Sequence, residues 1–146
     1  MTTIYGLNFS KLKLVYRSLC QNKIDSALDI LKDLERNTRS DPEEYVHVLL
    51  AFGYVYVQLK QYDLALEYFE KCLSLPSTPP EVYLLMSLTY SELGKYETAL
   101  EYADLALSLT KEPKESWLQF TLALQLEMGK VEEAQTTLNS ILHQAQ

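Results

Sequence analysis

The chain has 146 residues, of which 47% are hydrophobic and 23% are charged, and its formal net charge is −7. This composition is typical of a globular protein with a substantial core and excludes a disordered chain. The negative charge argues against a nucleic-acid partner, because phosphate recognition needs a basic surface. The charge is uneven, since residues 1–39 hold seven basic and four acidic side chains and residues 40–146 hold six and sixteen. We interpret this as the sorting of solvated helix faces; the alternative is that the ends attract a charged partner or a second copy of the chain.

Neither an export signal nor a membrane span is predicted. Residues 1–9 have no basic segment before their apolar residues, as a secretory signal would have. The longest nearly apolar run, residues 45–57, is interrupted by His47 and is shorter than the roughly 20 residues that span a bilayer. We therefore expect a cytoplasmic protein.

The first predicted helix is apolar on more than one side. Its apolar residues are too many for one narrow face, and they are Ile4, Tyr5, Leu7, Phe9, Leu12, Leu14, Val15, Tyr16 and Leu19. Either neighbouring helices of the same chain cover both sides, or a partner covers one of them in a homodimer or a heterodimer.

An internal repeat of 34 residues organises the centre of the chain. Residues 61–68 recur as residues 95–102, with Tyr, Ala, Leu, Glu and Tyr at matching positions. This period predicts a solenoid, in which each helix-turn-helix unit buries its apolar face against its neighbours. A small residue that lets two helices cross closely marks each second helix, at Ala27, Ala65, Ala99 and Ala134. We predict one domain, residues 1–146, with four units at about residues 8–37, 44–79, 80–113 and 114–146.

Capping and turn residues mark the expected helix ends. Asp41 and Thr78 each precede prolines and glutamates in the order of a capped helix start, so we expect both side chains to cap a helix. The turns inside the four units contain Asn22, Lys60, Gly94 and Gly129, at positions where a positive φ favours Gly and, less strongly, Asn. We expect residues 37–40 to form a lengthened loop between the first two units.

No pattern indicates catalysis, a metal or a cofactor. His47 and His143 lack the partners of a catalytic triad or the spacing of a metal site. Cys20 and Cys72 are far apart and have no paired Cys or His, so we expect two buried free thiols. We expect packing roles for the repeat-equivalent Tyr62, Tyr68, Tyr96 and Tyr102. The prediction is that the protein is not an enzyme.

Small and aromatic residues recur at fixed positions of the units. They are Tyr56, Ala65, Phe69 and Cys72 in the second unit and Tyr90, Gly94, Tyr96, Ala99 and Ala106 in the third. The fourth unit follows the pattern at Trp117, Gly129, Ala134 and Ile141, and the first keeps Ala27, Leu31 and Leu34. With this pattern the chain resembles the tetratricopeptide repeat proteins, although Lys60 replaces the usual Gly and Val131 the usual aromatic residue. The resemblance implies an all-α fold, a right-handed α-solenoid of about four tetratricopeptide-like units.

The resemblance also implies a binding groove on the concave face, built by the first helix of each unit. Carried over to this chain, the groove positions are Phe9, Leu12, Tyr16, Leu19, Leu50, Ala51, Tyr54, Val57, Leu84, Leu85, Leu88, Phe120 and Ala123. They are apolar or aromatic and lack the Lys, Arg and Asn with which some members hold a terminal carboxylate. We therefore expect an amphipathic helix or an extended segment with several hydrophobic anchors as the partner. An alternative is that the solenoid itself covers some of these residues.

The expected function is that of a non-enzymatic protein-binding module. Within this class, an acidic chain with an apolar groove and an apolar first helix resembles the type III secretion chaperones. The alternative is a structural scaffold subunit of a larger assembly that acts through its ends and its convex face.

Overall fold

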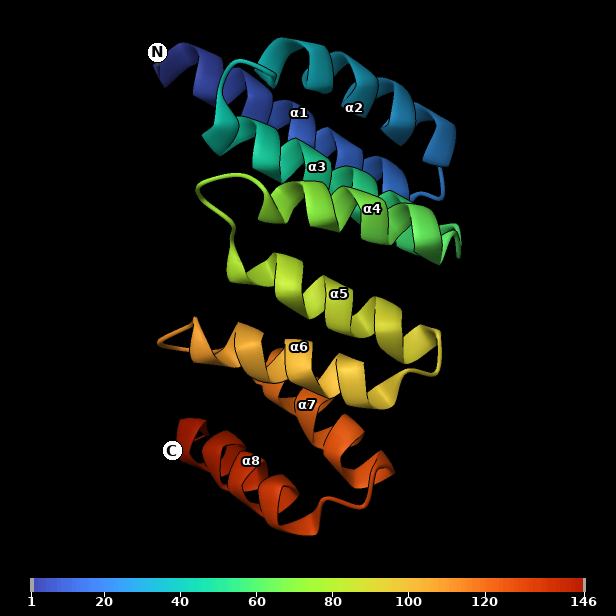
Figure 1. Ribbon diagram of the computed structural model, residues 1–146. Coiled ribbons are helices and arrows are strands. Elements are labelled where there is room, and N and C mark those ends of the chain that lie inside the picture. The colour runs from blue at the N-terminus through green and yellow to red at the C-terminus, as the bar shows by residue number, and fades with distance from the viewer. Residues whose placement is uncertain (1, 146) are drawn as a thin grey trace. The chain divides into compact units, whose positions relative to one another are not determined.

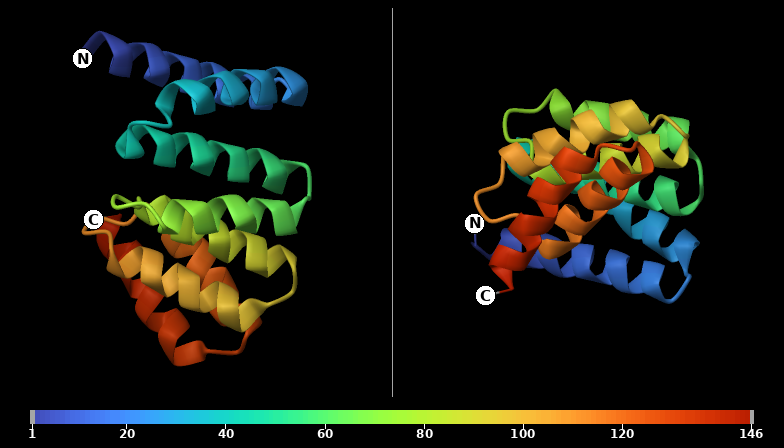
Figure 2. Two further views of the ribbon diagram at one scale, coloured as in Figure 1. Left: turned by 45° about the horizontal axis from the view of Figure 1, so that its top comes forward. Right: turned by 90° about the horizontal axis from the view of Figure 1, so that it is seen from below.

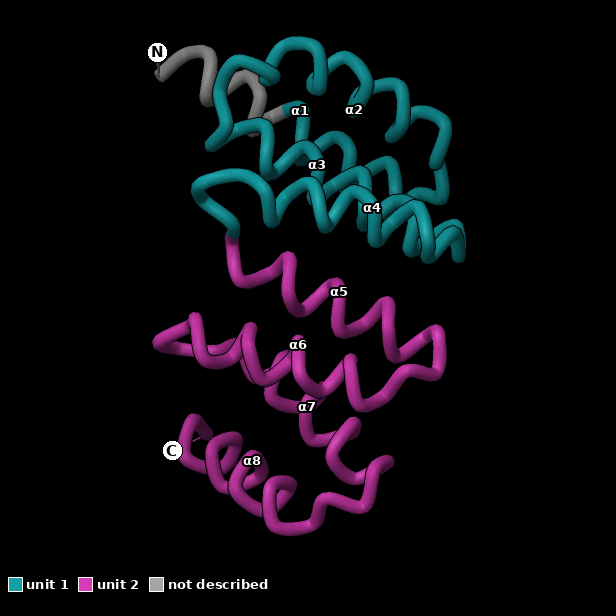
Figure 3. Tube along the Cα trace, in the orientation of Figure 1, with its two compact units in different colours: residues 1–78 teal, residues 79–146 magenta. Residues whose placement is uncertain are grey.

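The computed structural model describes the backbone of residues 2–145 and the side chains of residues 11–145. The described residues form eight α-helices and no strand (Figure 1). The chain divides into two compact units, residues 1–78 (unit 1) and residues 79–146 (unit 2), which Figure 3 colours separately. The predicted fold class, all-α with about four helix-turn-helix units, is confirmed, whereas the single domain stays a prediction.

Unit 1 contains two helix pairs. Helix α1 (Thr2–Cys20) pairs with α2 (Ile24–Thr38), and α3 (Pro42–Gln58) pairs with α4 (Tyr62–Leu73). Helix α3 also packs against α2 and α1, and Figure 2 shows these helices from two further directions. One core cluster joins the first three helices and consists of Val15, Ala27, Leu31, Leu34, Val48, Ala51, Phe52 and Val55. A salt bridge of 3.0 Å between Lys11 and Asp33 also links α1 to α2.

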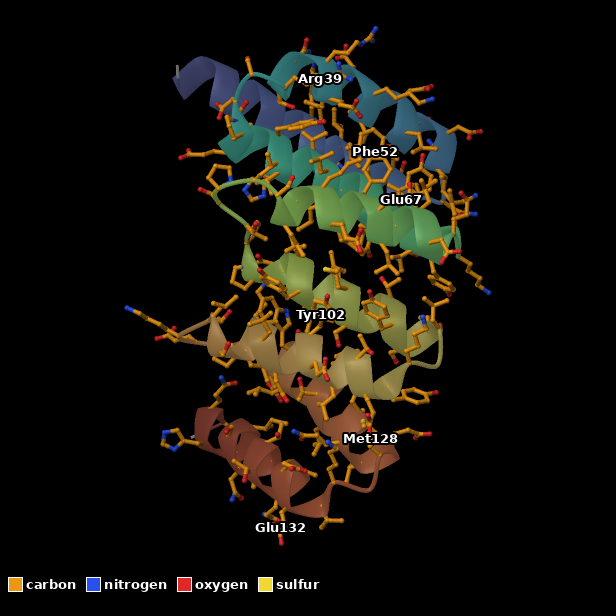
Figure 4. The ribbon with its side chains drawn as sticks, in the orientation of Figure 1. Arg39, Phe52, Glu67, Tyr102, Met128 and Glu132 are labelled. Atoms are coloured by element: carbon orange, nitrogen blue, oxygen red, sulfur yellow. The ribbon has the colours of Figure 1, made fainter. Side chains whose placement is uncertain are left out.

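Unit 2 contains the other two pairs. Helix α5 (Pro80–Glu92) pairs with α6 (Tyr96–Ser108), and α7 (Glu115–Glu127) pairs with α8 (Val131–Gln144). Helix α6 packs against α7. The core cluster between them consists of Ala99, Leu100, Ala103 and Leu124, with Tyr90, Phe120 and Met128 packed against it. Figure 4 labels Met128, at the end of α7.

A buried alanine lies in the second helix of every pair. Ala27, Ala65 and Ala99 are wholly buried, and Ala134 is nearly so. Because alanine projects only a methyl group, the helix backbones can approach closely there. The burial of all four positions agrees with their predicted role at helix crossings.

The turn inside every pair contains one residue with a positive φ. The angles are 59° at Asn22, 60° at Lys60, 78° at Gly94 and 71° at Gly129. At Lys60 the backbone N–H donates to the Val57 carbonyl, and the N–H of Gln61 donates to the Tyr56 carbonyl, both at 2.9 Å. The other three turns have the same two hydrogen bonds, which satisfy the last carbonyls of a helix. The turn positions predicted from the sequence are thus confirmed.

The loop predicted at residues 37–40 is wrong. Helix α2 continues to Thr38, which is wholly buried and whose hydroxyl donates to the Leu34 carbonyl at 2.7 Å. A buried side chain that completes the last turn extends the helix, so only residues 39–41 connect it to α3.

The two predicted helix caps had different outcomes. The Asp41 cap is confirmed, since its carboxylate accepts a hydrogen bond from the Glu43 N–H at 3.2 Å and Pro42 begins α3. The Thr78 cap is wrong, because Pro79 precedes α5 and no side chain caps that helix. The Thr78 hydroxyl donates to the Cys72 carbonyl at 2.9 Å, so it closes the end of α4.

Candidate functional site

Two tyrosines from different helices meet at the surface of unit 1. The rings of Tyr16 on α1 and Tyr54 on α3 pack edge to face, with centroids 6.0 Å apart and an interplanar angle of 67°. Tyr16 is 38% exposed, and Tyr54 is half-buried. Leu50, also half-buried, lies one helical turn before Tyr54 on the same face of α3. We call these three residues the Tyr16–Tyr54 surface.

The core of unit 1 fixes the position of this surface. Leu12 and Leu19 lie one turn before and one turn after Tyr16, and both pack against the core cluster. Val15, the residue before Tyr16, is wholly buried in that cluster. The core therefore fixes α1 around Tyr16, and α3 packs against α1. The two rings are thus positioned by helices and not by a loop.

Not all predicted groove positions of unit 1 are accessible. Ala51 and Val57 are buried, and Ala51 belongs to the core cluster. The side chain of Phe9 lies outside the described residues. The accessible positions are therefore those of the Tyr16–Tyr54 surface, flanked by the half-buried Leu12 and Leu19.

The predicted positions of unit 2 differ in character. Leu84, Leu85 and Leu88 on α5 are half-buried and aliphatic. Phe120 on α7 packs against the core cluster of the unit, and Ala123 is exposed. An aromatic pair like that of Tyr16 and Tyr54 cannot form from these positions, because Phe120 is their only ring.

Polar residues flank the Tyr16–Tyr54 surface at helical spacing. Lys13 and Cys20 lie three residues before and four residues after Tyr16, and His47 lies three residues before Leu50. All three are exposed. The groove predicted from the sequence does not include them, although their spacing of three or four residues from its members places them on the same helix faces.

The two cysteines have opposite surroundings. The expectation of two buried thiols is confirmed for Cys72 and wrong for Cys20, which is exposed. Burial raises the pKa of the Cys72 thiol to about 12, so it stays protonated at neutral pH. The exposed Cys20 beside Tyr16 is therefore the thiol that a reagent in solution can reach.

The described side chains contain no group suited to a metal. Within residues 11–145, no cluster of three or more His, Cys, Asp or Glu residues could hold a metal ion. His47 and His143 are both exposed. In the part of the chain that the structure describes, no helix combines the length and the apolar character needed to cross a membrane.

Comparison with known families identifies the central part of the chain. Residues 46–78 and 80–113 each match the family model described as the tetratricopeptide repeat. The chain contains two tetratricopeptide repeats. The first comprises α4 and most of α3, and the second comprises α5 and α6. The resemblance drawn from the sequence is confirmed for these repeats, while the comparisons do not support the type III secretion chaperone resemblance.

Solved structures show the same fold over most of the chain. BtubC from P. vanneervenii matches with a TM-score of 0.82 and 15% identity, over 94% of this chain and 62% of that one. A tetratricopeptide repeat protein from Parabacteroides merdae matches with a TM-score of 0.74 and 20% identity, over 93% and 52%. MamA matches with a TM-score of 0.69 and 15% identity, over 93% and 72%. This chain thus spans only part of each, and identities this low show the fold alone. No curated protein sequence matches the chain significantly.

Proposed function

We propose that the chain is a non-enzymatic protein-binding module, and that in unit 1 the Tyr16–Tyr54 surface holds an apolar or amphipathic segment of the partner. The observation that carries the proposal is the ring pair of Tyr16 and Tyr54, 6.0 Å apart at the surface. Tyrosine is enriched at interface hot spots, because it offers a large apolar ring, a polar tip and few rotatable bonds. The presence of tetratricopeptide repeats supports the same class of function.

The size of the surface limits the affinity that it can provide. Three apolar anchors contribute about 5–9 kcal/mol if each is worth roughly 1.5–3 kcal/mol on burial. Association costs about 4–15 kcal/mol in lost freedom. We therefore expect unit 1 by itself to bind an amphipathic segment weakly, with a Kd of micromolar order or above.

A labelled amphipathic peptide with Leu at every third or fourth position provides a direct test, with a scrambled peptide of the same composition as the reference. We expect Tyr16→Ser and Tyr54→Ser to raise the Kd at least tenfold in fluorescence anisotropy, as expected for hot-spot residues. Tyr96→Ser is the matched control, because Tyr96 lies on α6 and is 40% exposed, close to the value of Tyr16. Circular dichroism checks that each variant keeps its helices.

Thiol labelling tests the same proposal without a substitution. In the folded chain we expect a thiol reagent to modify Cys20 and to leave the buried Cys72 unmodified. The amphipathic peptide is expected to slow the modification of Cys20, which lies one turn from Tyr16. The proposal fails if the peptide binds without protecting Cys20, or if Tyr96→Ser weakens binding as much as Tyr54→Ser does.

The choice of partner is a finer hypothesis. A type III secretion chaperone in the cytoplasm would bind an export subunit by the same surface, so purified translocator and needle subunits can replace the peptide in the anisotropy assay. Loss of binding in Tyr54→Ser would support that hypothesis, whereas no binding to any of these subunits would reject it.

The second candidate function is a scaffold that acts through the ends of the chain, including a homodimer or a heterodimer through α1. It is favoured by exposed apolar side chains on the terminal helices, namely Leu14 on α1 and Leu142 on α8.

A further inference from the structure

The last helix of the chain leaves an apolar stripe exposed. Val131, Leu138 and Leu142 lie on one side of α8 and are 70%, 38% and 54% exposed. Ala134 and Thr137 are buried, and the Thr137 hydroxyl donates to the side-chain carbonyl of Gln125 on α7 at 2.7 Å. The stripe thus lies beside the face with which α8 packs on its own partner helix.

The same position is covered in the earlier pairs. Four residues after their buried alanines, α2, α6 and α8 have Leu31, Ala103 and Leu138. Leu31 and Ala103 are wholly buried, in clusters that include residues of α3 and of α7. Helix α2 packs on α3, and α6 packs on α7. The exposed stripe of α8 is therefore the place where the first helix of a following pair would pack.

Helix α1 also exposes an apolar side chain at a position that is buried in later pairs. Counted back from the turn residue with positive φ, Leu14 corresponds to Phe52 on α3 and to Thr121 on α7. Phe52 and Thr121 are buried, whereas Leu14 is 46% exposed. Helices α3 and α7 each pack on the second helix of the pair before them. The uncovered side of α1 thus matches the uncovered side of α8.

The charges of the two helices also fit each other. Helix α1 contains Lys11, Lys13 and Arg17 and no acidic residue, and Arg17 lies exposed in its last turn, while Lys11 is paired with Asp33. Helix α8 contains no Lys or Arg and begins with the exposed Glu132 and Glu133, of which Figure 4 labels Glu132. Consecutive helices joined by a short connection, such as α2 and α3, run antiparallel. An antiparallel contact between α8 and α1 brings Arg17 beside Glu132 and Glu133.

We propose that α1 of one copy of the chain docks on α8 of a second copy, in the way that α3 packs on α2 and α7 packs on α6. The contact uses a different patch on each copy, so each bound copy still offers one unoccupied patch. Such head-to-tail contacts build open chains or rings. The inference does not rest on the Tyr16–Tyr54 surface, and it gives the scaffold hypothesis a defined interface.

Sedimentation velocity over a concentration series tests the assembly. We expect the weight-average mass of the wild type to rise with concentration beyond that of two chains. Leu14→Glu alone and Leu138→Glu alone are each expected to stay monomeric. An equimolar mixture of the two variants is expected to form dimers and nothing larger, because each variant keeps one working end. Leu109→Glu is the control, since Leu109 is 53% exposed at the end of α6 and lies on neither face.

Charge reversal provides a second test with little risk to the fold. Arg17→Glu alone and a Glu132→Lys, Glu133→Lys double variant alone are each expected to weaken assembly. An equimolar mixture is expected to restore masses beyond two chains, because the unchanged helices pair as in the wild type and the two charge-reversed helices pair with each other. The proposal is overturned if the wild type stays monomeric at every concentration. It is also overturned if Leu14→Glu abolishes assembly while Leu138→Glu does not, since α1 would then pair with α1. Tyr54→Ser should assemble like the wild type, which separates this inference from the peptide-binding proposal.

Discussion

The two tetratricopeptide repeats pack the same aromatic stack in the same way. In the first, the rings of Tyr56 and Tyr68 lie 5.4 Å apart at an interplanar angle of 17°. In the second, the rings of Tyr90 and Tyr102 lie 5.4 Å apart at 11°. The two residues of each pair come from facing helices and are separated by 12 positions in both repeats. This shared stack explains why the tyrosines recur with the period of the repeat.

The repeats differ at the next contact between their helices. In the first, Gly53 on α3 faces Phe69 on α4, and a Cβ atom added to Gly53 would overlap the phenyl ring. In the second, the corresponding residues are Ser87 and Ala103, and the buried Ser87 hydroxyl donates to the Ala99 carbonyl. In the first repeat the second helix therefore supplies the larger side chain of the contact, and in the second repeat the first helix does. We therefore expect changes at the two positions to be coupled.

Removing the larger partner is expected to have the largest effect. Phe69→Ala should lower the free energy of unfolding by about 3–5 kcal/mol, because Phe69 is wholly buried and Gly53 cannot fill the cavity. Urea unfolding followed by circular dichroism measures the loss. A loss below about 1 kcal/mol would contradict the tight contact between the two residues.

The second repeat supplies the control for this prediction. Gly53→Ser alone should cost about 1–3 kcal/mol through overpacking against the ring. Combined with Phe69→Ala, it recreates the Ser and Ala of the second repeat and should recover part of the stability. We expect the double variant to be more stable than the sum of the single changes by at least about 1 kcal/mol. Strict additivity would show that the two sites are independent.

The turns of the two repeats allow a smaller exchange. Lys60 and Gly94 occupy equivalent turns with φ of 60° and 78° and make the same backbone hydrogen bonds. A positive φ costs an L residue roughly 1–2 kcal/mol. Glycine avoids this cost, but it loses more conformational entropy on folding, so only part of the difference appears in the free energy of unfolding. Lys60→Gly is therefore expected to raise the free energy of unfolding by up to about 1 kcal/mol, and Gly94→Lys to lower it by about 1 kcal/mol. Thermal unfolding of both variants checks the opposite signs; shifts of the same sign would rule out backbone strain as the cause.

Features set by one residue and its immediate neighbours could be predicted from the sequence. The turn at Gly94 follows from the demand for a positive φ, and the close crossing at Ala99 from side-chain size. The contact between Gly53 and Phe69 could not be predicted, because it depends on how two helices face each other. The Thr78 cap failed for a related reason: the residues near the turn favoured a cap, but a carbonyl six positions earlier, at Cys72, accepts the hydroxyl.

The sequence predicted which face of α3 carries the candidate site, but not how deeply each side chain is buried. Helical spacing places Leu50, Ala51 and Tyr54 on or near one side of α3, yet Ala51 is wholly buried and Tyr54 is not. The depth depends on α1, which packs against α3 and brings Tyr16 to Tyr54. The exposure of Cys20 was missed because no residue pattern distinguishes the covered side of α1 from its free side.

The smallest expected effect concerns Asp104, which occupies the position in the second repeat that Glu70 occupies in the first. Burial raises the pKa of the Asp104 carboxyl above its ordinary 3.8; Lys130 opposes this shift and Glu133 adds to it. Because the folded chain favours the neutral acid, the stability that Asp104 contributes is fully present below its ordinary pKa and is lost as pH rises through the raised pKa. Asp104→Asn should therefore stabilise unit 2 at pH 7, by less than about 1 kcal/mol for so exposed a group, and the gain should shrink towards about pH 4.

Urea unfolding followed by the fluorescence of Trp117, the single tryptophan, measures this gain in unit 2. Glu101→Gln on the same helix removes one negative charge from an exposed residue. An equal gain from Glu101→Gln would assign the effect to net charge and not to the burial of Asp104.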